Sequence, residues 1–558
     1  MLWIKLLVFL AISHFAQAFN EIQFPQFNDP IRFHHSDDSS PLNKSSITPK
    51  ITHYDTRKDA SSEGLQEFTP IRDTILQSQV NYYSFSVNSS SGLGEYYELL
   101  IFLSGNICTQ PDNIEVNETS LAVYYSFNST MFQNNEVGEM QLFENGYFQA
   151  LADLPIEPTS STTTTSSGTG AGGAGGAGGA TTPAVANAND EKILYIAVRA
   201  PQNTNVTASW TYQIGVSQND LVFQWDDRSF GSVVDTDDNL ALIVTNNLTV
   251  YDGDSDSLNT SDSKYSLYIY SYEDKDYFAG MNNSWCAVRN GPALMGPWNI
   301  ENSYTTRNGG LQQQFMIQGL NELTKYVAYI VADFEGTDFG GAVYHPFEFE
   351  TMTNTACELI YDLSFCDRVA YSVPAPGDPE YNDDKSTIKE LYDDYVKGLY
   401  TNFSKALQQV PCDTVPEAIY SNLRTCEDCA ESYKNWLCAV SIPRCNTKNV
   451  TKGYVLRNLT NQRNDFIKHT INPSQDYYEV LPCVNVCHAI VRDCPSDFGF
   501  MCPTKNESVS LSYYWDTFDN EQWPSCNYVG KFASQSSNAV KLLANWVLMV
   551  MVLSLHWL

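Results

Sequence analysis

The sequence predicts a multidomain protein in which one or two all-β sandwiches precede a disulfide-rich, mainly α-helical domain. The chain of 558 residues exceeds the roughly 100–200 residues of one typical domain. Short aromatic runs separated by turn-forming residues fill residues 67–352, which is typical of sandwiches. Beyond these runs, 12 of the 14 cysteines lie between Cys357 and Cys526.

The composition describes a folded acidic protein that does not bind nucleic acid. There are 65 acidic and 32 basic residues, and the resulting net charge of −33 repels a phosphate backbone over most of the surface. Hydrophobic residues make up 43% of the chain and charged residues only 17%, unlike a disordered acidic tail.

The N-terminal residues 1–18 predict a signal peptide. Lys5 precedes an apolar run over residues 6–12, and the small residues Ala16 and Ala18 fit a signal-peptidase site. A membrane anchor is disfavoured because this run is far shorter than the roughly 20 residues that span a bilayer. Residues 19–66 are largely polar, and we expect them to form a flexible arm.

Residues 67–255 are expected to form the first sandwich. Its strand-like runs cover residues 82–87, 96–103, 121–127, 141–151, 193–198, 206–214 and 239–244. Glycine and alanine repeats interrupt the series at residues 158–189, and such small side chains predict a mobile low-complexity loop. We expect this loop to be inserted in one sandwich; a linker between domains is the alternative.

A second sandwich is predicted over residues 262–352. Leu320, Thr324 and Tyr326 have the spacing of a corner at which a tyrosine hydroxyl bonds to upstream backbone. This stretch resembles the corner of fibronectin type III domains, and residues 347–351 resemble their closing strand. The alternative is an ordinary aromatic hairpin.

The period of the pattern changes in residues 357–530, the predicted cysteine-rich helical domain. Apolar residues three or four apart predict an amphipathic helix from Thr387 to Leu407, and Thr387 with Glu390 fits a capping box. Shorter helices are expected around residues 430–438 and 484–494. The acidic pair Asp393 and Asp394 is interpreted as the solvated face of the long helix.

The cysteines of this domain predict structural disulfides. Cys426 and Cys429 alone could form a redox or zinc pair, but a secreted chain with many other thiols favours disulfides. Only His469 and His488 occur nearby, and neither has the spacing of a zinc ligand, so we expect no metal and no cofactor. The predicted disulfide framework contains Cys357, Cys366, Cys412, Cys426, Cys429, Cys438, Cys445, Cys483, Cys487, Cys494, Cys502 and Cys526.

Sequons for N-glycosylation agree with secretion and mark exposed loops. They begin at Asn43, Asn88, Asn117, Asn128, Asn205, Asn247, Asn259, Asn282, Asn402, Asn449, Asn458 and Asn506.

No motif supports catalysis. The sequence lacks a nucleophile elbow, a zinc-protease helix and a phosphate-binding loop, so we expect no enzyme. Asp252, Asp254 and Asp256 alternate as calcium ligands do, but the glycine and distal glutamate of an EF-hand are misplaced. A solvated turn is therefore the favoured interpretation there.

Residues 531–558 end in a stretch that is apolar from Leu542 onward. Small residues at positions 534–538 favour a glycolipid-anchor signal that is removed with the tail. The alternatives are a retained transmembrane helix, for which the stretch is barely long enough, and a helix that lies on the membrane or is buried.

Residues 436–445, residues 482–487 followed by Cys494-Pro495, and residues 523–526 resemble the frizzled-type cysteine-rich domain in order and spacing. With the signal peptide and the glycosylated aromatic strands, the chain resembles most closely the mating-pheromone-induced-death family of fungi, a stretch-activated calcium-channel component. The resemblance implies an extracellular regulatory subunit that is required for calcium influx under mating, wall or membrane stress.

Hydropathy permits at most one membrane span, so we expect an accessory role beside a separate pore. The expected partner is a large, multi-span, voltage-gated-like calcium-channel pore subunit at the extracellular face of the plasma membrane. The residues expected to contact it are Trp436, Pro443, Pro482 and Trp523. The alternative is a glycolipid-anchored adhesion or ligand-binding glycoprotein.

Overall fold

The computed structural model describes residues 63–87, 98–111, 120–128, 138–155, 192–201, 208–248, 264–306, 310–334, 340–378, 385–411, 420–421, 423–450, 453–515 and 524–529. Several predictions concern residues outside these ranges. They are the signal peptide, nearly all of the N-terminal arm, the glycine-rich loop at 158–189, the aspartates at 252–256 and the C-terminal tail.

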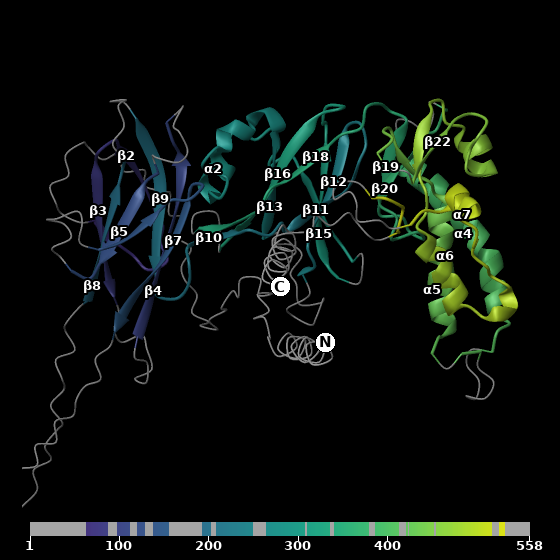
Figure 1. The fold of residues 1–558 in the computed structure, drawn as a ribbon, viewed down its shortest axis with the longest axis horizontal. Coiled ribbons are helices and arrows are strands. Elements are labelled where there is room, and N and C mark those ends of the chain that lie inside the picture. The colour runs from purple at the N-terminus through teal and green to yellow at the C-terminus, as the bar shows by residue number, and fades with distance from the viewer. Residues whose placement is uncertain are drawn as a thin grey trace, which may run out of the picture. The chain divides into compact units, whose positions relative to one another are not determined.

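Two sheets form the first sandwich (Figure 1). One has the strand order β1 (Glu63–Leu65), β3 (Val80–Val87), β8 (Lys192–Arg199), β5 (Ala122–Ser126) and β6 (Glu139–Leu142). The other has the order β2 (Ile71–Leu76), β9 (Ser209–Ser217), β4 (Glu98–Thr109) and β7 (Tyr147–Pro155). All pairs are antiparallel except β1 with β3.

Alternating apolar side chains explain why these strands pack face to face. Tyr83 and Phe85 on β3 and Trp210 and Tyr212 on β9 belong to one buried core, as the two-residue period of a strand requires. Strand β8 follows residues 158–189 and pairs with β3 and β5, so strands from both sides of the glycine-rich segment belong to one sandwich.

Two further sheets follow. One contains β10 (Phe223–Asp226), β17 (Gly341–Tyr344), β16 (Lys325–Asp333) and β13 (Tyr265–Ser271), and β18 (Phe347–Glu350) pairs with the first half of β16. The other has the order β11 (Gly231–Thr236), β12 (Leu240–Thr245), β15 (Gln312–Gln318) and β14 (Glu301–Thr305). A side chain at Gly231 would meet Ile330 and Phe347 of the first sheet, so the two sheets approach closely there.

The strand pairing differs from the predicted boundary between the two sandwiches, which the sequence placed at residues 255–262. Strands β10 to β12, residues 223–245, pair with β17 and β15 of the second pair of sheets. The sequence pattern placed them in the first sandwich because nothing in a strand's own alternation identifies its hydrogen-bonding partner. The predicted tyrosine corner is confirmed, since the Tyr326 hydroxyl accepts a hydrogen bond from the Asn321 N–H at 2.8 Å.

A disulfide and several buried hydrogen bonds connect the first sandwich to the elements that follow β13. These elements are the 3-10 helix η3 (Tyr272–Phe278) and helix α2 (Trp285–Asn290). Cys108 of β4 is bonded to Cys286 of α2. The Ser284 hydroxyl donates to the Ile107 carbonyl at 2.6 Å and also accepts from the Ala287 N–H, which caps α2.

The C-terminal part combines the predicted helices with short strands that the sequence pattern did not show. Its helices are α4 (Lys385–Leu407), α5 (Cys426–Ser441), α6 (Val484–Asp493) and α7 (Asn506–Ser512), with the short helices η5 (Ile467–Ile471) and η6 (Ser496–Phe498). Its strands are β19 (Cys357–Ile360) paired with β20 (Tyr371–Pro374), and the order β21 (Arg444–Asn446), β23 (Tyr477–Val480), β22 (Tyr454–Arg457). The strands are only three or four residues long, too short for a periodic pattern to show them.

Within the residues that the structure describes, no helix is both long enough and apolar enough to cross a membrane.

Candidate interaction pocket between α5 and α6

Helix α5 starts at a capping box that the sequence analysis did not identify. The Asp428 N–H donates to the Thr425 hydroxyl at 3.1 Å, and the Thr425 N–H donates to Asp428 Oδ2 at 2.8 Å. These two bonds satisfy backbone donors that a helix start leaves open. The capping box predicted at Thr387 is not at a helix start, because α4 already begins at Lys385.

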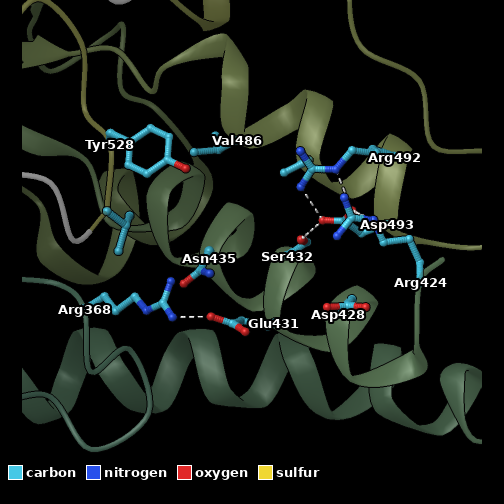
Figure 2. Close-up of a pocket in the computed structure, with 12 residues that line it drawn as sticks. Arg368, Arg424, Asp428, Glu431, Ser432, Asn435, Val486, Arg492, Asp493 and Tyr528 are labelled. Carbon is cyan, nitrogen blue, oxygen red and sulfur yellow. Dashed lines mark hydrogen bonds and ion pairs between the residues drawn. The ribbon is translucent and has the colours of Figure 1, made fainter. Parts of the chain in front are cut away.

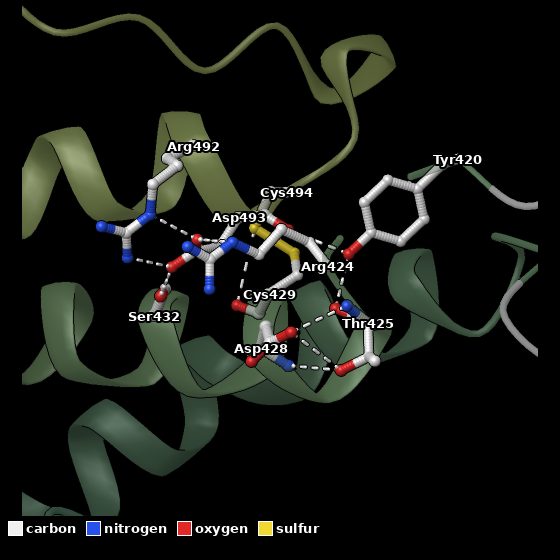
Figure 3. Close-up of a disulfide and its surroundings, with 9 residues drawn as sticks. All are labelled: Tyr420, Arg424, Thr425, Asp428, Cys429, Ser432, Arg492, Asp493 and Cys494. Atoms are coloured by element: carbon white, nitrogen blue, oxygen red, sulfur yellow. Dashed lines mark hydrogen bonds and ion pairs between the residues drawn. A yellow bond between two sulfur atoms is a disulfide. The ribbon is translucent and has the colours of Figure 1, made fainter. Parts of the chain in front are cut away.

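Disulfides attach α5 and α6 to each other and to their surroundings. Cys429, in the first turn of α5, is bonded to Cys494, which directly follows α6, with their Cα atoms 4.5 Å apart (Figure 3). The predicted framework is otherwise paired as Cys357–Cys445, Cys366–Cys438, Cys483–Cys526 and Cys487–Cys502. Cys426 is also disulfide-bonded, and Cys412 lies outside the described residues. Because Cys429 is bonded to Cys494, the Cys-x-x-Cys pair is not an internal redox disulfide.

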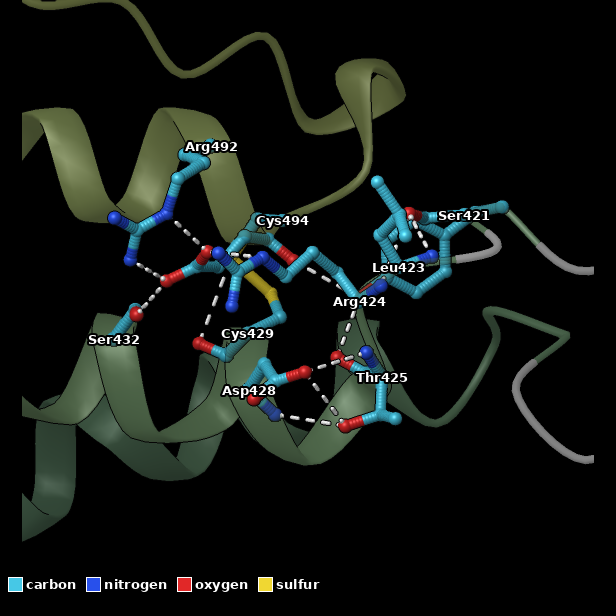
Figure 4. A network of polar contacts seen from close by, with 11 residues as sticks. Ser421, Leu423, Arg424, Thr425, Asp428, Cys429, Ser432, Arg492 and Cys494 are labelled. Atoms are coloured by element: carbon cyan, nitrogen blue, oxygen red, sulfur yellow. Dashed lines mark hydrogen bonds and ion pairs between the residues drawn. A yellow bond between two sulfur atoms is a disulfide. The ribbon is translucent and has the colours of Figure 1, made fainter. Parts of the chain in front are cut away.

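Asp493 is the polar centre between the two helices. Its carboxylate is almost fully buried, with 4% of the side chain exposed. It accepts from Arg492 Nε at 2.6 Å, from Arg492 Nη2 at 2.8 Å and from the Ser432 hydroxyl of α5 at 2.5 Å. Arg424 Nε lies 3.1 Å from Oδ1. Figures 3 and 4 show these groups converging on one carboxylate beside the disulfide.

This arrangement stabilises the charged form of Asp493. The hydrogen bonds from Arg492 lower the pKa of the Asp493 carboxyl, and the Ser432 bond and the nearby Arg424 charge act in the same direction, against the opposing effect of burial. The same contact raises the pKa of Arg492. Asp493 is therefore an ionised clamp between α5 and α6.

The loop before α5 is fixed by local hydrogen bonds. The Arg424 N–H donates to the Ser421 hydroxyl at 3.1 Å (Figure 4). The Tyr420 hydroxyl lies 2.5 Å from the Thr425 carbonyl and 2.9 Å from the Asp493 carbonyl, which joins the start of α5 to the end of α6. The backbone that carries Arg424 is consequently held on both sides.

A pocket of about 250 Å³ opens beside this clamp (Figure 2). It is lined by Arg368, Arg424, Asp428, Glu431, Ser432, Asn435, Val486, Ala489, Arg492, Asp493, Tyr528 and Val529. In Figure 2, Tyr528 and Val486 lie on one side, and Arg492, Asp493 and Arg424 lie on the other. Arg368 also lies on the side of Tyr528 in this view, so charged side chains stand on both sides of the pocket and only a few apolar side chains line it.

Two arginines of the pocket, Arg368 and Arg424, use only some of their hydrogen-bond donors in contacts with the protein. Arg368 forms one ion pair, between Nη2 and Glu431, and Arg424 forms one, to Asp493. Both side chains are 38% exposed. Each guanidinium carries five N–H donors in a planar fork, so most donors of these two residues have no protein acceptor within the described part of the chain.

The residues predicted to contact a partner lie in different environments. Trp436 is half-buried on α5, and its Nε1 donates to the Tyr513 hydroxyl at 2.8 Å. Pro443 and Pro482 are buried where strands and helices pack, so these two rings present no surface to a partner. Trp523 lies outside the described residues. A role for Trp436 stays a prediction.

Asp393 corrects the interpretation of the acidic pair. Asp394 is exposed as predicted, but Asp393 is buried on α4. Its carboxylate accepts from the Ser364 hydroxyl at 2.7 Å and from the N–H groups of Phe365 and Cys366 at 2.7 and 2.8 Å. Asp393 therefore holds the loop that carries the Cys366–Cys438 disulfide, a role that no local pattern reveals.

The sequons are distributed over exposed and half-buried sites. Asn128, Asn247, Asn282, Asn402 and Asn449 are exposed, Asn458 is half-buried, and Asn506 is the first residue of α7; the other five lie outside the described residues. Among the residues that the structure describes, no group of three or more His, Cys, Asp or Glu side chains is placed to hold a metal ion.

Together, these features describe a protein of β-sheets and disulfide-linked helices with a charged pocket. Comparison with known proteins gives its family: residues 100–532 match the family described as "Stretch-activated Ca2+-permeable channel component", and the chain belongs to this family. The chain is thus a channel component and not an enzyme.

Three curated relatives are similar to the chain. It is 36% identical to the stretch-activated cation channel MID1 of Saccharomyces cerevisiae over 500 residues, which cover 84% of this chain and 87% of that protein. It is 36% identical to the stretch-activated cation channel yam8 of Schizosaccharomyces pombe over 308 residues, which cover 54% and 61%. The MID1 protein of Cryptococcus neoformans is 26% identical over 238 residues, which cover 37% and 36%.

Among solved structures, a glycoside hydrolase domain of Endo-D from Streptococcus pneumoniae is similar over 50% of this chain and 32% of that chain, with 8% identity. Its TM-score of 0.17 is too low to carry any argument about fold or function.

Proposed function

We propose that the chain is an extracellular regulatory subunit of a plasma-membrane calcium channel and that it docks on the outer face of a separate, multi-span pore subunit. Stretch, mating or wall stress would then raise calcium influx only when this subunit is bound. The family description supports a role in a calcium-permeable channel without assigning the pore to this chain.

The observation that carries the proposal is the disulfide-stapled C-terminal part. Five disulfides join described cysteines within residues 357–526, Cys426 is bonded as well, and such bonds are typical of oxidising compartments. A surface fixed by cross-links avoids the ordering cost that a flexible surface incurs on binding. The α5–α6 region, with its accessible charged pocket, is the best candidate for the docking face.

Affinity purification tests the proposal. A tagged chain, extracted from membranes with detergent, is expected to recover a multi-span calcium channel in stoichiometric amounts. Failure to recover any such channel, with normal calcium influx in cells that lack the chain, would favour the alternative of an anchored adhesion or ligand-binding glycoprotein.

Cysteine variants test which part docks. Replacing Cys438 of α5 or Cys487 of α6 with serine removes the cross-link to Cys366 or to Cys502, respectively, and is expected to abolish calcium influx. Surface abundance must be measured in parallel, since reduced abundance alone reports a folding defect. Normal influx in both variants at normal abundance contradicts docking through this region.

A further inference from the structure

We infer that the pocket between α5 and α6 receives the carboxylate of an aspartate or glutamate side chain from a protein partner, with Arg368 and Arg424 as its hydrogen-bond donors. The identification of that partner as the pore subunit rests on the proposed function. The expectation that the pocket binds a carboxylate rests only on the residues that line it.

The inference starts from an imbalance between donors and acceptors. Asp493 already accepts hydrogen bonds on both oxygens, and Asp428 Oδ2 is engaged by the N–H and the hydroxyl of Thr425. Arg368 and Arg424, by contrast, each use one nitrogen for one carboxylate. A ligand that brings acceptors can therefore bind the remaining N–H donors of Arg368 and Arg424, although Asp428 and Glu431 also line the pocket.

The shape of the donors fits a carboxylate. A guanidinium fork matches the two oxygens of a carboxylate and binds them through parallel charge-assisted hydrogen bonds. A phosphate dianion fits less well, because Asp428 and Glu431 also line the pocket and repel the second negative charge. Arg492 is not counted as a donor, since its fork already holds Asp493.

The apolar members of the lining can contact the carbon atoms of an acidic side chain. Val486, Ala489 and Val529 line the pocket together with Tyr528, and the β and γ methylenes of a glutamate can pack against them. The volume of about 250 Å³ is far above the roughly 10–15 Å³ that one water molecule needs, so a side chain can enter.

The backbone that carries one of the two donors, Arg424, is also fixed before a ligand arrives. The Cys429–Cys494 disulfide and the Ser432–Asp493 hydrogen bond hold α5 against α6, and Ser421 holds the backbone of Arg424. Binding therefore loses little conformational entropy. This pocket lies in a chain of net charge −33, so its arginines give an acidic partner a local site on an otherwise repulsive surface.

Arginine-specific labelling tests the inference on the full-length purified glycoprotein. Phenylglyoxal is added with a capped peptide that contains one glutamate, and modification at each arginine is quantified by mass spectrometry. The glutamate peptide is expected to slow modification of Arg368 and Arg424 at least threefold, while the matched glutamine peptide has no effect. Arg228, whose side chain is 50% exposed elsewhere in the chain, serves as the reference.

Variants sharpen the result. Arg424→Gln removes one donor and is expected to reduce the peptide's protection of Arg368 to less than half. Lys275→Gln removes an exposed cation that also pairs with a single glutamate, Glu348, and is expected to leave the protection unchanged. Equal rates with the glutamate and glutamine peptides overturn the inference.

The purified channel complex separates the two proposals. Arg368 and Arg424 are expected to be protected in the complex relative to the free chain. Unchanged reactivity in an intact complex overturns the inference and leaves the auxiliary-subunit role standing. Protection by the glutamate peptide without recovery of any channel supports the carboxylate site and contradicts the proposed partner.

Discussion

Arg444 and Asp235 form a buried ion pair, with Arg444 Nη2 2.9 Å from Asp235 Oδ2 and the two side chains only 8% and 5% exposed. Asp235 belongs to β11 of the second pair of sheets, and Arg444 begins β21 of the C-terminal part. The Ser372 N–H donates to the same oxygen at 3.1 Å. A neighbouring buried carboxylate, Asp237, pairs at 2.5 Å with Lys385 of α4, whose side chain is 36% exposed. Two buried carboxylates of the β11 region are thus each paired with a cation of the C-terminal part.

Arg444→Gln is expected to destabilise the protein by about 3–5 kcal/mol, because it leaves the Asp235 charge buried without its partner. Urea unfolding of the secreted chain measures this loss. Arg228→Gln is the control: it breaks the exposed Arg228–Asp226 pair and should cost less than about 1 kcal/mol. Similar losses in the two variants contradict a stabilising role for the buried pair.

Asp393→Asn is expected to lower stability by about 1–3 kcal/mol for each donor that it leaves unsatisfied. The amide offers one acceptor oxygen to the Ser364, Phe365 and Cys366 donors that now share a carboxylate. Asp394→Asn, one residue away on the exposed face, should change stability by less than about 0.5 kcal/mol. Urea unfolding of the two variants measures both losses of stability. Equal unfolding midpoints for the two variants contradict the buried role of Asp393.

This pair of aspartates shows how far the sequence predicts the fold. The helix that carries them was predicted from apolar spacing, and α4 extends only two residues further at its start. The same periodicity could not separate Asp393 from Asp394, because burial of an acidic residue depends on which loop packs above it. Asp393 is buried and Asp394 is exposed because the loop at residues 364–366 packs over Asp393.

The pocket was missed for a related reason. The helices α5 and α6 were expected, but their contact depends on the Cys429–Cys494 pairing, and cysteine spacing alone does not determine connectivity. The Cys108–Cys286 pair is a different case. Both cysteines stand outside the C-terminal block, and the structure pairs them with each other.

Asp493→Asn is expected to remove a pH-dependent contribution to stability. The pKa of Asp493 is lower in the folded than in the unfolded protein. The ionised carboxylate therefore contributes its full stabilisation above the unfolded-state pKa of about 3.9, and this stabilisation is lost as the pH falls through the folded-state pKa. The difference in unfolding midpoint between wild type and variant should be constant from pH 7 to pH 5 and shrink below about pH 4. A difference that is as large below pH 3 as it is at pH 7 contradicts this assignment.

The last prediction concerns the disulfide between the first sandwich and α2. Replacing both Cys108 and Cys286 with serine avoids a lone thiol and removes a cross-link between residues separated by 178 positions. The loss of stability is expected to be about 2–5 kcal/mol, since the cross-link restricts the unfolded chain. The Ser284 and Asn106 hydrogen bonds to the opposite element remain, so the secreted variant should still fold. Peptide mapping without reductant must first recover Cys108 and Cys286 in one linked fragment of the wild type; separate fragments contradict the pairing whatever the variant's stability.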